Sequence, residues 1–404
     1  MTAIGRVAQL ALAIVITRLH GVESYGLFVL ILASVLMLQH PVSLGLPTAS
    51  MKFIPDYLET NQPALLRGFL RFSNLSILST SCFAILGIYI FSTLVDWSVL
   101  DQISLIVFFL LLLSITFLQL KKRQLAALGR AAEGAFWEVV FPYISLISIL
   151  SIVRDTQVNE VLYIFSLIIS CSAIMASWRF RKAIKSDLPD GITTYNARHW
   201  LKTSFPFLLT FSARDLMNRV DILLLAPLVG LTQVGLYSAA FRVIYLITFT
   251  QNILISVMSP RYAGAFASNK MIQLNKNLKL SYFFTLITVI PLTILLTLFA
   301  DKIVVLLFGE AFLGSASILR ILVVAQVLAA LIAPLIALLN MIGYEKQISI
   351  YNFIALFFLS LFCILFINQA AAIGAAWARV LTFAILGFLI VKLARVALLE
   401  GRTR

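Results

Sequence analysis

Long apolar stretches recur along the whole chain and are separated by short polar junctions. A helix of about 20 apolar residues spans the roughly 30 Å hydrocarbon core of a bilayer. The sequence therefore predicts an all-α polytopic membrane protein. The predicted crossings, about 12 transmembrane helices in all, lie near residues 3–20, 25–47, 71–95, 102–120, 134–153, 159–179, 204–228, 234–258, 280–300, 315–340, 348–367 and 371–394.

The composition supports a membrane protein and explains the high positive charge. Of the 404 residues, 61% are hydrophobic and 12% are charged, whereas soluble domains carry about 25% charged residues. The net charge of +14 comes from basic residues in short junctions at one end of the helices, so no nucleic-acid partner is expected. The three cysteines lie in apolar stretches without metal-ligand spacing, and no metal site or disulfide framework is expected.

The distribution of Lys and Arg predicts the orientation of the chain. Most of these 31 residues lie near the two termini and in every second junction, whereas the other junctions hold only Arg18, Arg154 and Lys302. Because cytoplasmic loops carry the excess of Lys and Arg, both termini are predicted to be cytoplasmic.

An internal repeat indicates two halves. Gly21-Val-Glu-Ser-Tyr-Gly-Leu-Phe28 has the same layout as Gly230-Leu-Thr-Gln-Val-Gly-Leu-Tyr237, and each follows the first long helix of its half. The longest junction, near residues 181–200, contains the polar run Asp-Leu-Pro-Asp-Gly. We therefore predict an N-terminal six-helix lobe (1–185), a cytoplasmic linker (186–200) and a C-terminal six-helix lobe (201–404), an arrangement found among transporters.

Five charged residues interrupt the apolar hairpin from Ser212 to Arg242. They are Arg214, Asp215, Arg219, Asp221 and Arg242. An ionised side chain near the bilayer centre costs roughly 2.5–3.5 kcal/mol on the most lenient insertion scale, so these groups need partners or a wet cavity. Helical spacing places Arg214 and Asp221 on one face, with Asp215 and Arg219 beside it. This polar half is predicted to line a central, water-filled cavity.

The arginines of the hairpin admit two interpretations. In a cavity, Arg214, Arg219 and Arg242 can bind a phosphate or pyrophosphate through bidentate hydrogen bonds. Alternatively, Asp215–Arg219 and Asp221–Arg242 are ion pairs that allow the hairpin to insert. Asp221 and Arg242 are equally distant from the turn, so we predict a structural salt bridge between these two.

Three further charged residues lie outside this hairpin. Glu138 can bind a coupling ion or proton, as can Asp215, or it can pair with Lys52 or Arg130. Arg18 is either interfacial or part of an outward-facing cavity that binds pyrophosphate. For Arg379 near the start of the last crossing, we favour snorkelling to the outer face.

Motifs of enzymes are missing from the sequence. The chain has no GxxxxGK[ST] loop, no Asp-x-Asp and no HExxH, and no predicted outer loop is long enough for a catalytic domain. The sequence therefore predicts a protein that is not an enzyme and needs no cofactor.

Several segments, in order and spacing, resemble the oligosaccharide flippases of bacterial polysaccharide biosynthesis, the Wzx-type branch of the MOP exporter superfamily, which is related to MATE exporters. They are Thr17-Arg-Leu-His-Gly-Val-Glu-Ser-Tyr-Gly-Leu-Phe28, Leu44-Gly-Leu-Pro-Thr-Ala49, Lys52-Phe-Ile-Pro55, Asp221, Val234-Gly-Leu-Tyr-Ser-Ala-Ala-Phe-Arg242, Leu306-Leu-Phe-Gly-Glu-Ala-Phe312 and Gly374-Ala-Ala-Trp-Ala378.

This resemblance implies two lobes around a central cavity, which alternate between inward- and outward-facing states in a bacterial inner membrane. It implies a substrate made of an oligosaccharide on polyprenyl pyrophosphate, surrounding membrane lipids, and polysaccharide polymerase and chain-length proteins as partners. Cationic cavity residues in the family engage the pyrophosphate.

Two other functions are open on the sequence. A MATE-like exporter of organic cations needs net acidic groups in its cavity, whereas the hairpin has three Arg and two Asp. A polymerase or ligase of the same pathway needs a large outer loop, and no such loop is predicted from this sequence.

Overall fold

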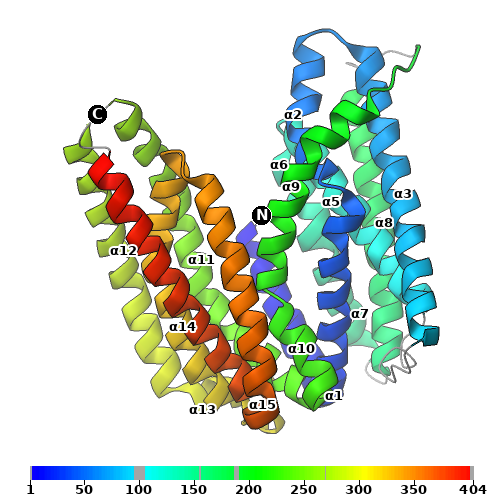
Figure 1. Cartoon of the computed structure of the whole chain (residues 1–404). Helices are drawn as coiled ribbons and strands as arrows, with labels where there is room; N and C mark the ends of the chain where they lie inside the picture. Colours follow the sequence, from blue (N-terminus) through cyan, green and yellow to red (C-terminus); the bar gives the residue numbers. More distant parts are fainter. Residues whose placement is uncertain (1, 95–104, 154–155, 186–190, 269, 401–404) are drawn as a thin grey trace. The chain divides into compact units, whose positions relative to one another are not determined.

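The computed structural model describes residues 2–94, 105–153, 156–185, 191–268 and 270–400, and within these ranges the regular secondary structure is helical (Figure 1). The helices are α1 (Thr2–Ser43), α2 (Leu46–Glu59), α3 (Pro63–Leu94), α5 (Leu105–Ala127), α6 (Ala131–Ala135), the π-helical turn η1 (Phe136–Val140), α7 (Phe141–Ile152), α8 (Val158–Ile184), α9 (Ala197–Met217), α10 (Val220–Val229), α11 (Leu231–Ala267), α12 (Met271–Leu298), α13 (Ala300–Phe308), the 3₁₀ turn η2 (Glu310–Phe312), α14 (Ser315–Met341) and α15 (Glu345–Glu400).

Nine helices in the described ranges are long and apolar enough to cross a membrane. Two of them contain a break at which two predicted crossings meet, at Gly21 in α1 and at Ala370–Ala371 in α15. The predicted crossing 204–228 is divided between α9 and α10. Within the described residues, every predicted crossing therefore lies mainly on helix. Residue 95 of one predicted crossing and residues 102–104 of the next lie outside the described residues. The count of 12 stays a prediction.

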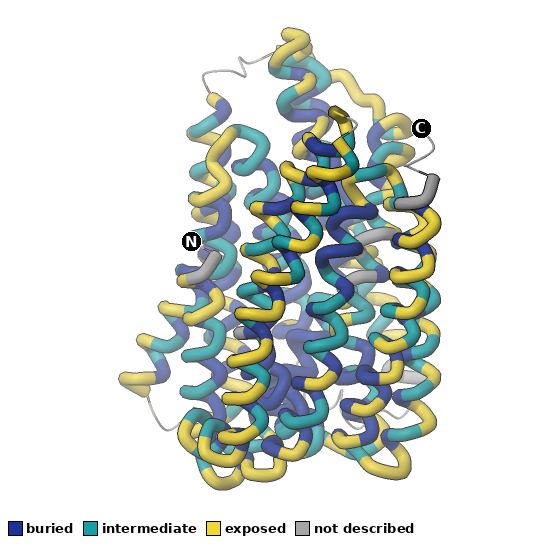
Figure 2. Tube along the Cα trace, turned by 90° about the vertical axis from the view of Figure 1, so that its left-hand side faces the viewer, coloured by how far each residue is buried: buried dark blue, intermediate teal, exposed yellow. Residues whose placement is uncertain are grey.

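Large apolar side chains are exposed along these helices, as expected for a protein surrounded by lipid. Phe83 of α3, Phe283 of α12, and Phe357 and Phe388 of α15 are all exposed. Figure 2 shows that exposed positions alternate with buried ones over the length of the helices. Apolar surface of this extent is stable against acyl chains and not against water. The chain is thus an integral membrane protein.

The described chain forms two compact units. The first contains Met1–His20 and Leu30–Asp215, and the second contains Gly21–Val29 and Leu216–Arg404. These units differ from the predicted lobes in two places. The short segment Gly21–Val29 belongs with the C-terminal helices, and most of α9 belongs with the N-terminal ones.

The first unit fixes the end of the predicted linker by direct hydrogen bonds. Trp200 is fully buried in the unit's core and donates to the Tyr57 hydroxyl at 2.8 Å. Arg67 donates twice to the Ile192 carbonyl, at 3.0 and 2.8 Å. The described part of the linker therefore belongs structurally to the first unit.

In the second unit, the two repeat motifs contact each other reciprocally. Gly21 and Gly230 share one backbone conformation, with φ/ψ of 77°/−169° and 86°/173°. A Cβ atom on Gly26 would lie 2.1 Å from the Leu231 carbonyl oxygen, and one on Gly235 would lie 2.2 Å from that of Val22. Positive φ and close backbone approach both require glycine.

Candidate functional site

A buried polar cluster in the second unit surrounds Asp221, in the first turn of α10. The Asp221 carboxylate is fully buried and accepts hydrogen bonds from the Tyr237 hydroxyl and from the Ile222 N–H. The Arg379 guanidinium lies 2.7 Å from the same carboxylate. A buried carboxylate needs such partners, because an unpaired charge in the membrane interior is strongly unfavourable.

Arg379 also connects the two sides of the break between α9 and α10. Its guanidinium donates to the Met217 carbonyl at 3.3 Å, and it lies 4.5 Å from the centre of the Phe241 ring. The side chain is only 7% exposed. The interpretation of Arg379 as a snorkelling residue is therefore wrong.

The partner that the structure gives to Asp221 is Arg379, whereas the sequence predicted Arg242. Equal distance from the turn fixes the depth of two residues but not the side of the helix on which they lie. Tyr237 faces Asp221, and Arg242 is five residues further along α11, which rotates it by about 140°. The Arg242 side chain is half-buried beside the Tyr25 hydroxyl.

The other arginines predicted to bind pyrophosphate are distributed over the two units. Arg219 is half-buried at the break before α10, where its backbone N–H donates to the Leu216 carbonyl at 3.0 Å. Arg18 is an exposed residue of α1. Arg214 lies on α9, but its side chain is outside those that the structure describes.

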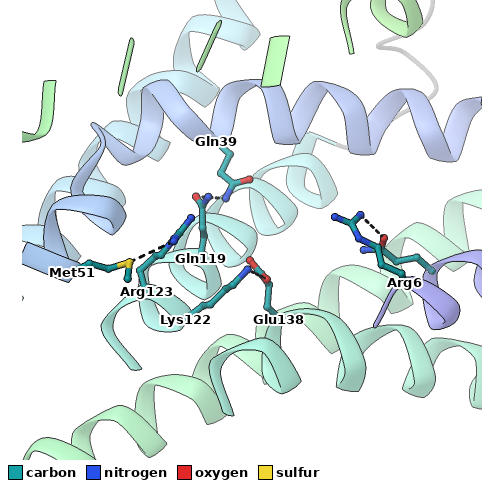
Figure 3. Close-up of polar contacts among 8 residues, drawn as sticks. Arg6, Gln39, Met51, Gln119, Lys122, Arg123 and Glu138 are labelled. Atoms are coloured by element: carbon teal, nitrogen blue, oxygen red, sulfur yellow. Dashed lines mark hydrogen bonds and ion pairs between the residues drawn. The ribbon is translucent and has the colours of Figure 1, made fainter. Parts of the chain in front are cut away.

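The two acidic residues predicted as coupling groups both lie in the first unit and both contact a basic residue. Asp215 lies 2.8 Å from the His40 Nε2. Glu138 pairs with Lys122 and not with Lys52 or Arg130, the two partners considered above (Figure 3). Arg130 instead contacts Glu133, which also pairs with Arg179.

The position of Glu138 depends on the π-helical turn η1. A π-turn adds a residue to the helical repeat, and such turns are frequent at functional sites. At the preceding helix α6, a Cβ atom on Gly134 would lie 2.9 Å from the Lys122 carbonyl oxygen. The missing side chain therefore lets α6 and η1 approach α5 closely enough for Glu138 to reach Lys122.

A polar face of α5 was not singled out from the sequence. Gln119, Lys122 and Arg123 are spaced i, i+3 and i+4, so they share one face of a membrane helix. Gln119 accepts a hydrogen bond from Gln39 of α1, and Arg123 donates to the Met51 sulfur of α2 at 3.4 Å (Figure 3). The signal was present in the sequence as three polar residues at helical spacing.

The fold described above consists of long apolar helices with breaks and buried polar contacts, and it defines the chain as a polytopic helical membrane protein. The chain matches no family profile and no curated protein. Solved structures of membrane transporters do match it over nearly the full length. The predicted fold class, an all-α polytopic membrane protein of the MATE/MOP type, is confirmed.

Three of these structures illustrate the likeness. A multidrug resistance MATE family transporter of the MOP superfamily, in an inward-facing conformation, matches with a TM-score of 0.75 and 15% identity, over 99% of this chain and 96% of that one. The lipid II flippase MurJ matches with a TM-score of 0.74 and 16% identity, over 99% and 88%. A MOP superfamily transporter from Pyrococcus furiosus has a TM-score of 0.69 and 17% identity, over 99% and 93%.

Proposed function

We propose that this chain is a flippase for oligosaccharide repeat units linked to polyprenyl pyrophosphate. It would move them from the cytoplasmic to the outer leaflet of a bacterial inner membrane by alternating access, in surface polysaccharide biosynthesis. The observation that carries the proposal is the balance of charge. Glu138, Asp215 and Asp221 lie within membrane helices and each contacts a basic residue. The hairpin from Ser212 to Arg242 contains three Arg and two Asp, and this excess of positive charge favours an anionic substrate.

The pyrophosphate would be bound by the arginines predicted from the sequence, Arg214, Arg219, Arg242 and Arg18. A guanidinium presents parallel N–H groups that match two oxygens of a phosphate. The shared fold with a lipid II flippase supports a lipid-linked substrate. The shared fold with a MATE transporter leaves an exporter of organic cations as the alternative, but the paired acidic residues argue against it.

The proposal is tested by reconstituting the full chain in liposomes with a fluorescent polyprenyl-pyrophosphate oligosaccharide. Flipping is measured as the increase in the fraction that a membrane-impermeant quencher reaches, with ethidium uptake as the parallel assay for cation export. We expect flipping without ethidium transport. Arg219→Ala and Arg242→Ala should each lower the flipping rate about tenfold or more at unchanged abundance, since a charge-assisted hydrogen bond contributes about 1.5–3 kcal/mol. Ethidium transport without flipping would refute the proposal.

The predicted orientation has its own test. Single cysteines at Ser268 and Thr232, both exposed, are introduced after the three native cysteines are replaced. In intact cells, a membrane-impermeant maleimide should label the cysteine at position 232 and not that at position 268, because position 268 lies in a junction rich in Lys and Arg. Labelling of position 268 and not of position 232 would mean that the chain has the orientation opposite to the predicted one.

A further inference from the structure

We propose that Lys122 and Arg123 of α5 form a second anion-binding site, in the first unit, which takes the pyrophosphate of the lipid-linked substrate. In this proposal, the Glu138 carboxylate pairs with Lys122 in the absence of substrate, and the pyrophosphate of the substrate takes the place of this carboxylate. The inference rests on the proposed function for the identity of the ligand. The site itself is argued from the contacts of the first unit.

The first observation is the environment of Arg123. Among the described residues, the hydrogen-bond acceptor that the Arg123 guanidinium reaches is the thioether sulfur of Met51, 3.4 Å away. Thioether sulfur is a weak acceptor and carries no charge. Arg123 lies near the end of α5, beyond the predicted crossing 102–120. A guanidinium at this level of the membrane can bind a phosphate through two parallel hydrogen bonds.

The second observation is the polar surface beside Arg123. The side chain lines a small cavity whose other polar members include His40, Ser43, Thr48 and Gln119. The cavity measures about 20 Å³, which is room for a water molecule and not for a phosphate. A phosphate would therefore bind at the mouth, with the guanidinium at one side and these hydrogen-bonding groups beneath it.

The third observation is that Lys122, the cation next to Arg123, is held in a partly exposed ion pair with Glu138, which a substrate anion can displace. The Lys122 and Glu138 side chains are 33% and 23% exposed. A partly exposed ion pair is much weaker than a buried one, and a multivalent anion competes with it readily. Gln119 accepts from Gln39 on the same face, so an amide pair adjoins both cations (Figure 3).

The fourth observation is an excess of positive charge at this end of the unit. Lys122 and Arg123 are adjacent cations of α5, and Glu138 is the carboxylate that pairs with Lys122. Arg6 of α1 instead donates to Gln9 of its own helix, 3.3 Å away. Two cations of α5 therefore share this end of the unit with one carboxylate. A pyrophosphate diester carries an ionised oxygen on each phosphorus and would balance this excess.

The test measures binding to the purified full chain in detergent micelles by thermophoresis, with three probes: polyprenyl pyrophosphate, phosphatidylglycerol and inorganic pyrophosphate. Lys122→Gln with Arg123→Gln should weaken polyprenyl pyrophosphate binding about tenfold or more, since two charge-assisted contacts are lost. Glu138→Gln should act in the opposite direction and strengthen binding severalfold, because the competing carboxylate is gone. The matched control is Lys279→Gln with Lys346→Gln, which removes two exposed cations of the second unit and should leave affinity unchanged.

The outcomes separate this inference from the proposed function. If the Lys122/Arg123 variant binds polyprenyl pyrophosphate like the control, or if Glu138→Gln weakens binding, the site is wrong even where flipping is intact. Equal losses for phosphatidylglycerol would assign the site to membrane phospholipid and overturn the proposed ligand. Binding that depends on these residues in a protein that does not flip would refute the proposed function alone. Should the double variant not fold, Arg123→Lys keeps the charge, and its affinity should fall between those of wild type and a folded Arg123→Gln single variant.

Discussion

Replacing Asp221 with Asn should sharply lower the stability of the folded protein, although the two side chains have nearly the same shape. The substitution removes the charge that faces Arg379 at 2.7 Å and leaves a guanidinium buried at 7% exposure. Breaking a buried ion pair by removing one partner costs roughly 3–5 kcal/mol. The measurement is the free energy of unfolding in a denaturing detergent, together with the folded fraction on size-exclusion chromatography.

A double-mutant cycle tests whether the pair itself is responsible. Arg379→Met should be as damaging as Asp221→Asn, since it leaves the carboxylate unpaired. The double variant holds no buried charge, and the amide oxygen introduced by Asp221→Asn can still accept from the Tyr237 hydroxyl, so it should recover most of the loss. The Asp301–Arg320 pair supplies the control. These side chains lie 2.6 Å apart but are 53% and 39% exposed, and Asp301→Asn should cost about 1 kcal/mol or less.

The outcome bears on function as well as on stability. If Asp221→Asn behaves like Asp301→Asn, the buried pair does not stabilise the break between α9 and α10. A folded double variant that still flips its substrate would make the Asp221–Arg379 cluster structural. A folded double variant without transport would place the cluster in the transport cycle.

The sequence predicted the apolar helices because membrane insertion is decided by local properties. A segment of about 20 apolar residues forms a helix in lipid whatever its neighbours are, since its backbone polar groups must pair internally. The repeat at Gly21 and Gly230 was also visible, and both residues adopt the same backbone conformation. The close backbone contacts of Gly26 and Gly235 could not be predicted from the sequence, because they depend on which segments pack together.

The choice of ionic partners could not be predicted in the same way. The hairpin pattern indicates the depth of Asp221 and Arg242, but the side of each helix that faces its neighbour depends on packing. Arg379 is more than 150 residues away from Asp221 and meets it only because α15 packs on α10. The partner of Glu138 depends on the π-turn at Phe136–Val140, which changes the helical phase on which partner predictions rely.

The reciprocal contact of the repeat motifs supports the second large prediction. Gly26→Ala and Gly235→Ala should each destabilise the protein, although alanine forms helices better than glycine does. The added methyl group would lie 2.1 Å from the Leu231 carbonyl oxygen in the first variant and 2.2 Å from that of Val22 in the second. These are backbone atoms, so the clash is relieved only by moving the helices apart. Overpacking of this kind typically costs about 1–3 kcal/mol.

Gly264→Ala is the matched control, because Gly264 lies on α11 like Gly235 and a Cβ atom there would meet nothing within 4 Å. Alanine at this position should stabilise the protein by about 0.5–1 kcal/mol through helix propensity. The thermal midpoint of the purified protein measures all three variants. Opposite shifts for Gly235→Ala and Gly264→Ala, on one helix and with one chemical change, would show that the contact with Val22 requires the glycine. A Gly235→Ala variant as stable as Gly264→Ala would mean that the two motifs do not pack this closely.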